Sequence, residues 1–147
     1  MANRIDVRLQ AAKATGTVIM APFVTVGFPD MDASFSISAA LLEAGADIVE
    51  LGVPFSDPLA EGVTIQKTSY RALQQGVTLR GCLDVARRLR ERVVDAPIVL
   101  MGYYNPFVRY GLSNFVGDAS AVGVDGLIVA DLPTEESDTL RDLLERR

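Results

Sequence analysis

Four short, mostly apolar runs constrain the fold more than any other feature of the sequence. They span residues 18–25, 46–51, 97–101 and 126–131 and are rich in Val, Ile and Leu. Apolar runs of this length are typical of strands that are buried on both faces, as in parallel sheets. Segments with helical apolar spacing lie between them, so the sequence predicts an α/β fold with right-handed crossovers.

Helix signals divide the rest of the chain. Apolar spacing followed by Gly predicts helices that begin near residue 3, at the caps Asp32, Thr64 and Thr78, near Asn114, and near Pro133. Residues 102–106 (GYYNP) are predicted to form a loop. Four strands fit either a doubly wound sheet or part of a (β/α)8 barrel, which needs eight strands and ~250 residues. The pattern alone leaves both open.

Composition narrows the class of protein. The 147 residues, 49% of them hydrophobic, are predicted to form a single domain, residues 1–147. A net charge of -5 argues against a nucleic-acid or anionic membrane surface. No run approaches ~20 apolar residues and the N-terminus lacks an apolar core, so neither a membrane span nor a signal peptide is expected. The single Cys82 fits a reducing cytosol. The absence of His excludes a His-based metal site, and none is predicted.

A carboxylate at the end of the second run is the sharpest candidate for chemistry. Glu50 interrupts an apolar run just before a loop rich in Pro, Gly and acids. The C-terminal end of a parallel strand is where α/β active sites are built. The alternative is a buried Glu satisfied by neighbours such as Thr25 or Tyr103. The position at the strand end favours a general acid or base.

Further acids follow in the same loop and after the fourth run. Asp57 precedes Pro58 and fits an Asx turn or a contact with a partner. Glu61 precedes Gly62 and fits either a catalytic or a solvent-exposed carboxylate. Asp131 is more readily a cap or turn residue.

Apolar and aromatic side chains accompany these acids near the strand ends. They can serve as core or as a pocket for a flat apolar ring. They are Phe23, Ile65, Met101, Tyr103 and Ile128. No G-x-G-x-x-G follows a strand, so a dinucleotide site is not predicted.

The loop and its flanking segments resemble a known family. Residues 50–60 (ELGVPFSDPLA) are similar to the signature of the tryptophan synthase alpha subunit, and residues 22–29, 64–66, 101–106 and 126–133 resemble that family's segments in the same order. The resemblance covers essentially the whole chain. It implies a (β/α)8 TIM barrel of which this chain carries the first four βα units, a half-barrel.

The resemblance also implies a reaction. Such lyases cleave indole-3-glycerol phosphate to indole and glyceraldehyde 3-phosphate by a retro-aldol step without a cofactor, in tryptophan biosynthesis. Glu50 would protonate indole C3, and Glu61 would accept from the indole N–H. The apolar pocket would be formed by Phe23, Ile65, Met101, Tyr103 and Ile128.

A partner is implied as well. Indole would pass to a beta subunit that holds pyridoxal phosphate, in a cytoplasmic alpha2beta2 heterotetramer. The residues expected to face that subunit are Pro54, Ser56, Asp57, Pro58 and Asn105.

The chain departs from the family pattern in three respects. Glu61 stands where the family usually has Asp, and Val63 stands where Pro is common. The family's phosphate-binding glycines and serine belong to later βα units. We therefore expect residues 1–147 alone to be nearly inactive. The alternative function is a non-catalytic half-barrel that self-associates or docks on a beta-type partner.

Overall fold

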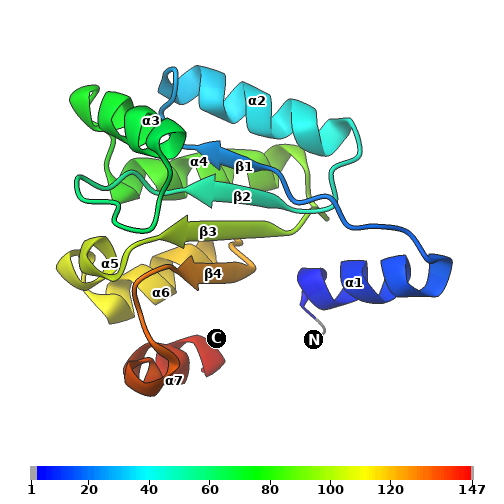
Figure 1. Cartoon of the computed structure of the whole chain (residues 1–147). Coiled ribbons are helices and arrows are strands. Elements are labelled where there is room, and N and C mark those ends of the chain that lie inside the picture. The colour runs from blue at the N-terminus through cyan, green and yellow to red at the C-terminus, as the bar shows by residue number, and fades with distance from the viewer. Residues whose placement is uncertain (1–2, 147) are drawn as a thin grey trace.

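The strands pair side by side in the order in which the chain forms them. The computed structural model describes residues 3–146. One parallel sheet with the order β1-β2-β3-β4 is formed by β1 (Phe23–Thr25), β2 (Val49–Gly52), β3 (Ile98–Gly102) and β4 (Gly126–Val129) (Figure 1). A doubly wound sheet reverses its strand order at a switch point, and no reversal occurs here. The doubly wound alternative is therefore wrong, and the sheet is that of a half-barrel.

Helices cover one face of this sheet and one of its ends. They are α1 (Arg4–Thr15), α2 (Met31–Glu43), α3 (Val63–Gln74), α4 (Leu79–Arg92), α5 (Tyr104–Tyr110), α6 (Leu112–Ala121) and α7 (Asp138–Glu145), with a 3-10 turn over Thr134–Glu136. In Figure 1, α4 and α6 lie behind the strands, and α1 lies beside the N-terminal ends of the strands. No helix between residues 3 and 146 is long and apolar enough to cross a membrane.

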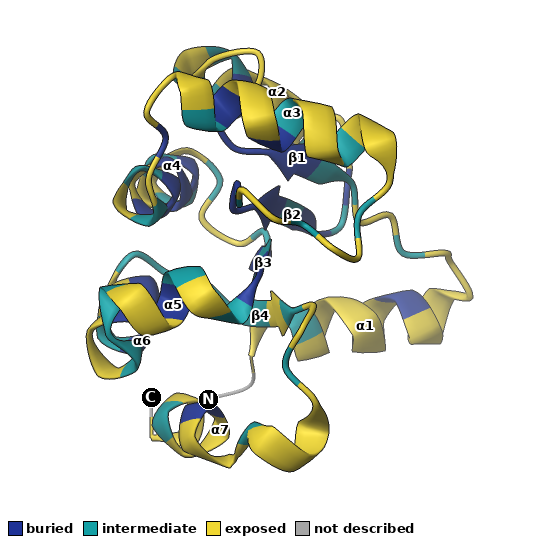
Figure 2. Ribbon diagram, turned by 60° about the vertical axis from the view of Figure 1, so that its left-hand side comes forward, coloured by how far each residue is buried: buried dark blue, intermediate teal, exposed yellow. Residues whose placement is uncertain are grey.

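The two faces of the sheet differ in burial, and β4 at its edge is less buried than β1 to β3 (Figure 2). Side chains alternate along each strand, and paired residues of neighbouring parallel strands point to the same side. We call the helix-packed side the covered face; its side chains are Val24, Val49, Leu51, Ile98 and Leu100, the last four fully buried. We call the other side the open face; its residues are Phe23, Thr25, Glu50, Gly52, Val99, Met101, Gly126 and Ile128.

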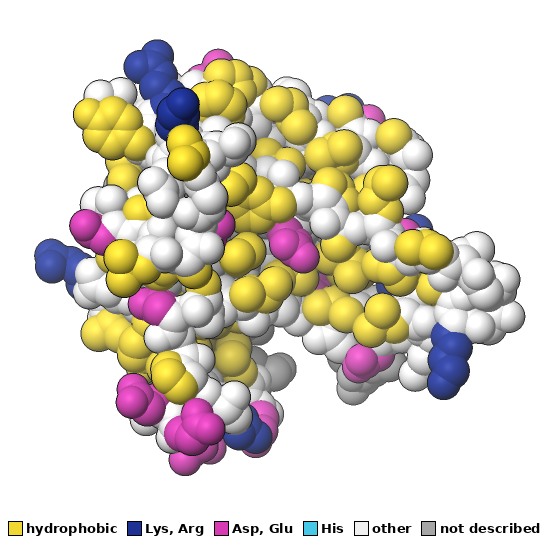
Figure 3. Space-filling model, viewed as in Figure 1, with side chains coloured by type: hydrophobic (Ala, Val, Ile, Leu, Met, Phe, Trp, Pro, Cys, Tyr) yellow, Lys and Arg dark blue, Asp and Glu magenta, His cyan; other side chains and the backbone are white. Residues whose placement is uncertain are grey.

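The open face is apolar but incompletely covered. Phe23, Glu50 and Met101 are half-buried, and Ile128 is 39% exposed. In Figure 3, which views the molecule from the same side as Figure 1, hydrophobic side chains surround acidic groups near the centre of this face. The part of the chain that the structure describes thus leaves polar and apolar groups accessible on one side of the strands.

Two aspartates each link the N-terminal ends of two adjacent strands. Asp47, before β2, accepts the Met20 N–H at 2.9 Å, and Asp125, before β4, accepts the Ile98 N–H at 2.9 Å. Both lie two residues after a helix-ending Gly, and this shared arrangement is a short internal repeat in the sequence. Each aspartate therefore ties its own strand to the strand before it.

The same two aspartates hold α1 in place. Arg4 pairs with Asp125 at 2.8 Å and Arg8 pairs with Asp47 at 3.0 Å. The arginines lie one helical turn apart, so they project from one side of α1. The helix is attached across the N-terminal end of the sheet, and the opposite end is left to the loops that follow the strands.

The first strand is shorter than predicted. Residues 18–25 form one apolar run, yet β1 begins at Phe23. Val18 and Met20 are 90% and 63% exposed, and Pro22 has no N–H to donate. An apolar run becomes a strand only where a neighbour pairs with it.

Three local predictions need correction and one is confirmed. Asp30, not Asp32, caps α2 by accepting the Ala33 N–H, and Gly62, not Thr64, precedes α3. The predicted loop at 102–106 is wrong beyond residue 103, because α5 begins at Tyr104. Pro106 lies in the first turn of α5, where the missing N–H costs nothing. The predicted cap Thr78 is confirmed by its bond to the Gly81 N–H.

Candidate active site

Glu50 lies on the open face near the C-terminal end of β2. It pairs in register with Phe23 and Val99 and is half-buried. Neither neighbour that could have satisfied a structural Glu bonds it: the Thr25 hydroxyl bonds the Thr68 hydroxyl at 2.8 Å, and the Tyr103 hydroxyl accepts the Ala60 N–H. Within residues 3–146 nothing donates a hydrogen bond to the Glu50 carboxylate. A half-buried carboxylate without a partner can exchange protons with a ligand.

The loop that carries Glu61 is anchored on both sides of that residue. The Tyr103 hydroxyl accepts the Ala60 N–H at 2.8 Å, and the Gln66 amide donates to the Glu61 carbonyl at 2.9 Å. The Glu61 N–H donates to the Pro58 carbonyl at 3.2 Å. These bonds fix the backbone, while the half-buried Glu61 side chain makes no ion pair or hydrogen bond with any other described residue.

A small cavity gathers Glu61 and four of the five predicted pocket residues. Its lining includes Phe23, Glu61, Ile65, Met101 and Tyr103. Its volume is only about 10 Å³, far below the ~300–1,000 Å³ of a ligand pocket. The described residues therefore supply one wall of a pocket, mostly apolar, with Glu61 as its one acid.

Gly52 makes room for that wall. A Cβ added to Gly52 would lie 2.2 Å from Cζ of Phe23, an impossible contact. Only glycine at this place in β2 lets the Phe23 ring lie across the end of the strand. The fifth predicted pocket residue, Ile128, pairs with Met101 on the open face but does not line the cavity.

The residues expected to face a partner surround the same end of the sheet. Ser56, Asp57 and Asn105 are exposed, and the Ser56 hydroxyl donates to Asp57 at 2.5 Å. Pro54 is buried and Pro58 is half-buried beside the cavity. Pro54, Ser56 and Asn105 line one open hollow of about 500 Å³. The structure thus brings three of these five residues to one surface.

Some roles are not visible in the sequence. Tyr103 was expected as a pocket residue or as a partner of Glu50, yet its hydroxyl anchors the Glu61 loop, and nothing in the local pattern marks Gln66. Asp131 was expected to be a cap or turn residue before Pro133, but its side chain instead accepts the Tyr104 N–H at 2.7 Å, at the start of α5. These contacts join residues that lie far apart or on different elements.

Comparison with known families gives a consistent result. A sequence model of the family described as "Tryptophan synthase alpha chain" matches residues 9–147. The tryptophan synthase alpha chain of Roseiflexus castenholzii is 50% identical over 135 residues, which cover 92% of this chain and 52% of that protein. That of Chloroflexus aggregans is 46% identical over 141 residues, covering 96% and 53%. The chain spans about half the length of these relatives.

Solved structures agree with the sequence relatives. The tryptophan synthase alpha subunit of Legionella pneumophila superposes with a TM-score of 0.97 at 38% identity, over 99% of this chain and 56% of that one. A chain of tryptophan synthase from M. tuberculosis, in an aminoacrylate-bound form, gives a TM-score of 0.94 at 34% identity, over 99% and 58%.

Proposed function

Because the chain belongs to the tryptophan synthase alpha chain family, we propose that it carries the two acids of an indole-3-glycerol phosphate lyase. The reaction is the cleavage of that substrate to indole and glyceraldehyde 3-phosphate in tryptophan biosynthesis. In this proposal, residues 1–147 are the N-terminal part of the barrel, a single domain, and the later βα units supply the contacts to the substrate phosphate.

One observation carries the proposal: the unpartnered Glu50 on the open face, beside an apolar cavity bordered by Glu61. Glu50 pairs in register with Phe23, which lines that cavity. An acid that serves only stability is normally paired when it is half-buried. A flat apolar ring held against Phe23 and Met101 would have one acid at the strand and the other on the loop.

The two acids have complementary tasks in the proposed reaction. The Glu61 carboxylate accepts the indole N–H and stabilises the positive charge that develops on nitrogen. Glu50 donates a proton to indole C3, and its carboxylate then takes the proton of the glycerol hydroxyl. The bond from C3 to the glycerol chain breaks with its electrons returning to the ring, and the hydroxyl carbon becomes the aldehyde. Protons and electrons balance without a cofactor.

We further propose that the chain works with a beta-type subunit, as an alpha2beta2 assembly in the cytoplasm, with pyridoxal phosphate held by the partner. The exposed Ser56 and Asn105 support this part, because they line a hollow that shares Phe55 with the cavity, at the end of the sheet where product would leave. The alternative of a self-associating module is favoured only by the exposed Ile128 on the open face.

The test is an assay of indole release. Residues 1–147 are joined to the C-terminal half of the Roseiflexus castenholzii relative, and the Glu50→Gln variant is compared with the joined parent. We expect Glu50→Gln to lower kcat by at least ~10²–10⁴-fold, the range of general acid–base catalysis.

The matched control is Glu135→Gln, an exposed acid that forms no ion pair among the described residues. It should leave turnover unchanged. Normal turnover by Glu50→Gln would reject the assignment. An inactive joined parent, together with size exclusion showing a concentration-dependent dimer of residues 1–147, would favour the self-associating module.

A further inference from the structure

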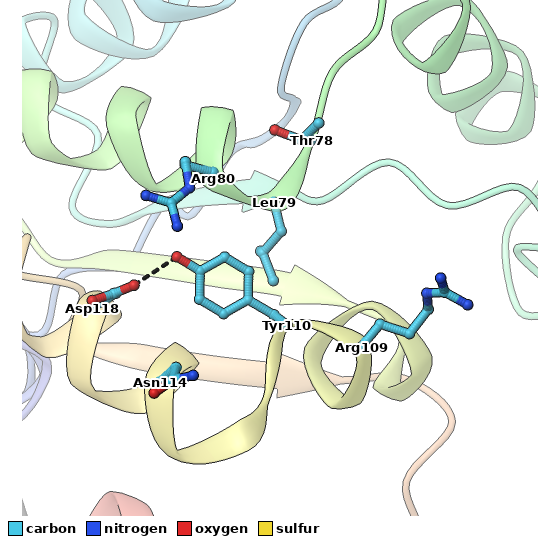
Figure 4. A pocket seen from close by; sticks show the side chains of 7 residues that line it. All are labelled: Thr78, Leu79, Arg80, Arg109, Tyr110, Asn114 and Asp118. Atoms are coloured by element: carbon cyan, nitrogen blue, oxygen red, sulfur yellow. Dashed lines mark hydrogen bonds between the residues drawn. The ribbon is translucent and has the colours of Figure 1, made fainter.

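A second open hollow lies next to the expected partner surface. It has a volume of about 640 Å³ and lies between the start of α4 and the helices α5 and α6 (Figure 4). Thr78, Arg80, Arg109, Tyr110 and Asp118 are among the residues that line it. None of these residues belongs to the proposed active site.

The two hollows form one continuous surface. The hollow lined by Pro54, Ser56 and Asn105 shares Leu79, Arg109 and Tyr110 with the hollow lined by Arg80 and Asp118. A partner that covers the first hollow therefore also contacts residues at the edge of the second.

The second hollow carries positive charge that the rest of the chain does not neutralise. Arg80 and Arg109 are exposed, and within residues 3–146 neither forms an ion pair. Six other arginines, by contrast, pair with acids. Other described arginines, such as Arg71 and Arg141, also lack an ion pair, but only Arg80 and Arg109 among the described arginines without one line this hollow. Guanidinium groups bind carboxylates with two parallel hydrogen bonds.

Tyr110 organises the hollow. Its hydroxyl donates to Asp118 at 2.6 Å, and the Arg80 guanidinium lies 5.7 Å from the centre of its ring (Figure 4). The bond to Asp118 raises the pKa of Tyr110, so the hydroxyl remains a donor at neutral pH. Asp118, the one acid among the lining residues, is thereby held by a neutral group and forms no ion pair with either arginine, so two positive groups face one negative group.

We propose that the contact surface for the beta-type partner extends into this hollow, where Arg80 and Arg109 bind an acidic segment of that partner. The inference rests on the proposed function, since the partner is the one proposed above. The occupant is a partner segment with carboxylates because the hollow is basic and continues the expected interface.

The experiment measures the Kd of residues 1–147, alone and joined to the C-terminal half of the Roseiflexus castenholzii relative, for the beta subunit of that organism. Exposed ion pairs each strengthen binding by roughly 1.5- to 5-fold. The Arg80→Ala/Arg109→Ala pair should therefore raise the Kd roughly 2- to 25-fold and flatten its dependence on salt. The control pair is Arg71→Ala/Arg141→Ala, exposed arginines outside both hollows that remove the same charge.

A second variant acts in the opposite direction. Asp118→Asn removes the only acid of the hollow but leaves an oxygen that can accept from Tyr110. It should lower the Kd about twofold or more, a gain that a misfolded chain cannot produce.

The outcomes separate the two proposals. If neither wild-type form binds the beta subunit, the proposal of a beta-type partner and the proposal of an extended contact surface are both wrong. If the wild type binds and the Arg80/Arg109 pair behaves like its control, only the extension into this hollow is wrong. If the pair instead weakens self-association of the chain without the partner, the occupant is a second copy and the inference is overturned.

Discussion

One face of the sheet carries the buried core, and the other carries the proposed site. On the covered face, Val49, Leu51, Ile98 and Leu100 have no exposed surface, and α2, α4 and α6 supply the opposing side chains. On the open face, residues of the same strands carry Glu50 and the wall that borders Glu61. Successive residues of a strand therefore serve different purposes, because alternation sends them to opposite sides.

The difference explains where an acid can be placed. A carboxylate on the covered face would be buried among apolar groups at a cost of several kcal/mol. Glu50 avoids this cost because the open face leaves it half-exposed. Its register neighbours on that face, Phe23 and Val99, are apolar.

The largest expected effect is the loss of stability when an Ile on the covered face, rather than one on the open face, is replaced by Ala. Ile98→Ala, on the covered face, should lower the free energy of unfolding by about 2–5 kcal/mol, because the fully buried side chain leaves a cavity. Ile128→Ala, on the open face at 39% exposure, should cost less than about 1 kcal/mol. Urea unfolding of the two variants measures both values, and equal losses would remove the distinction between the faces.

A smaller effect concerns the loop above the open face. In the joined lyase, Glu61→Ala should lower kcat/KM by roughly 10- to 100-fold, while Glu61→Asp should retain part of the activity, because the anchors at Ala60 and Gln66 keep the backbone in place. The unfolding free energy should not change in either variant. If kcat/KM is the same for Glu, Asp and Ala at position 61, Glu61 is only a surface charge.

The smallest expected effect is a pH dependence of stability that arises from a buried thiol in the core behind the covered face. Burial raises the pKa of Cys82 to about 12 from an ordinary 9.0. The unfolded thiol ionises first, so its contribution to stability is complete below pH 9 and is lost as pH rises toward 12. The wild type should lose about 1 kcal/mol more than Cys82→Ala between pH 7 and 9.5. Urea midpoints at the two pH values measure this, and parallel losses would place the thiol in contact with solvent.

Much of this arrangement could be predicted because it depends on local pattern. The apolar runs located all four strands, and Gly16, Gly45, Gly76 and Gly123 ended helices as expected, each with positive φ. Strand order could not be decided from periodicity, since four strands fit two topologies. The family resemblance resolved that choice, and the order β1-β2-β3-β4 confirms it.

The remaining features depend on contacts between distant residues. Asp30 and Asp32 are equally good caps by type, and only the backbone at residue 30 decides between them. The anchor from Tyr103 to Ala60 joins residues 43 positions apart, and the Arg80–Tyr110 contact joins two helices. Hydrophobic periodicity carries no information about such pairs.

The central claim is that the open face is one wall of a lyase site that the remaining βα units must complete. The direct measurement is indole release by residues 1–147 before and after addition of the separately produced C-terminal half of the Roseiflexus castenholzii relative. We predict negligible release without that half, because the phosphate contacts that position the substrate are missing, and restored release with it. The restored activity should disappear in Glu50→Gln. Robust turnover by residues 1–147 alone would contradict the claim.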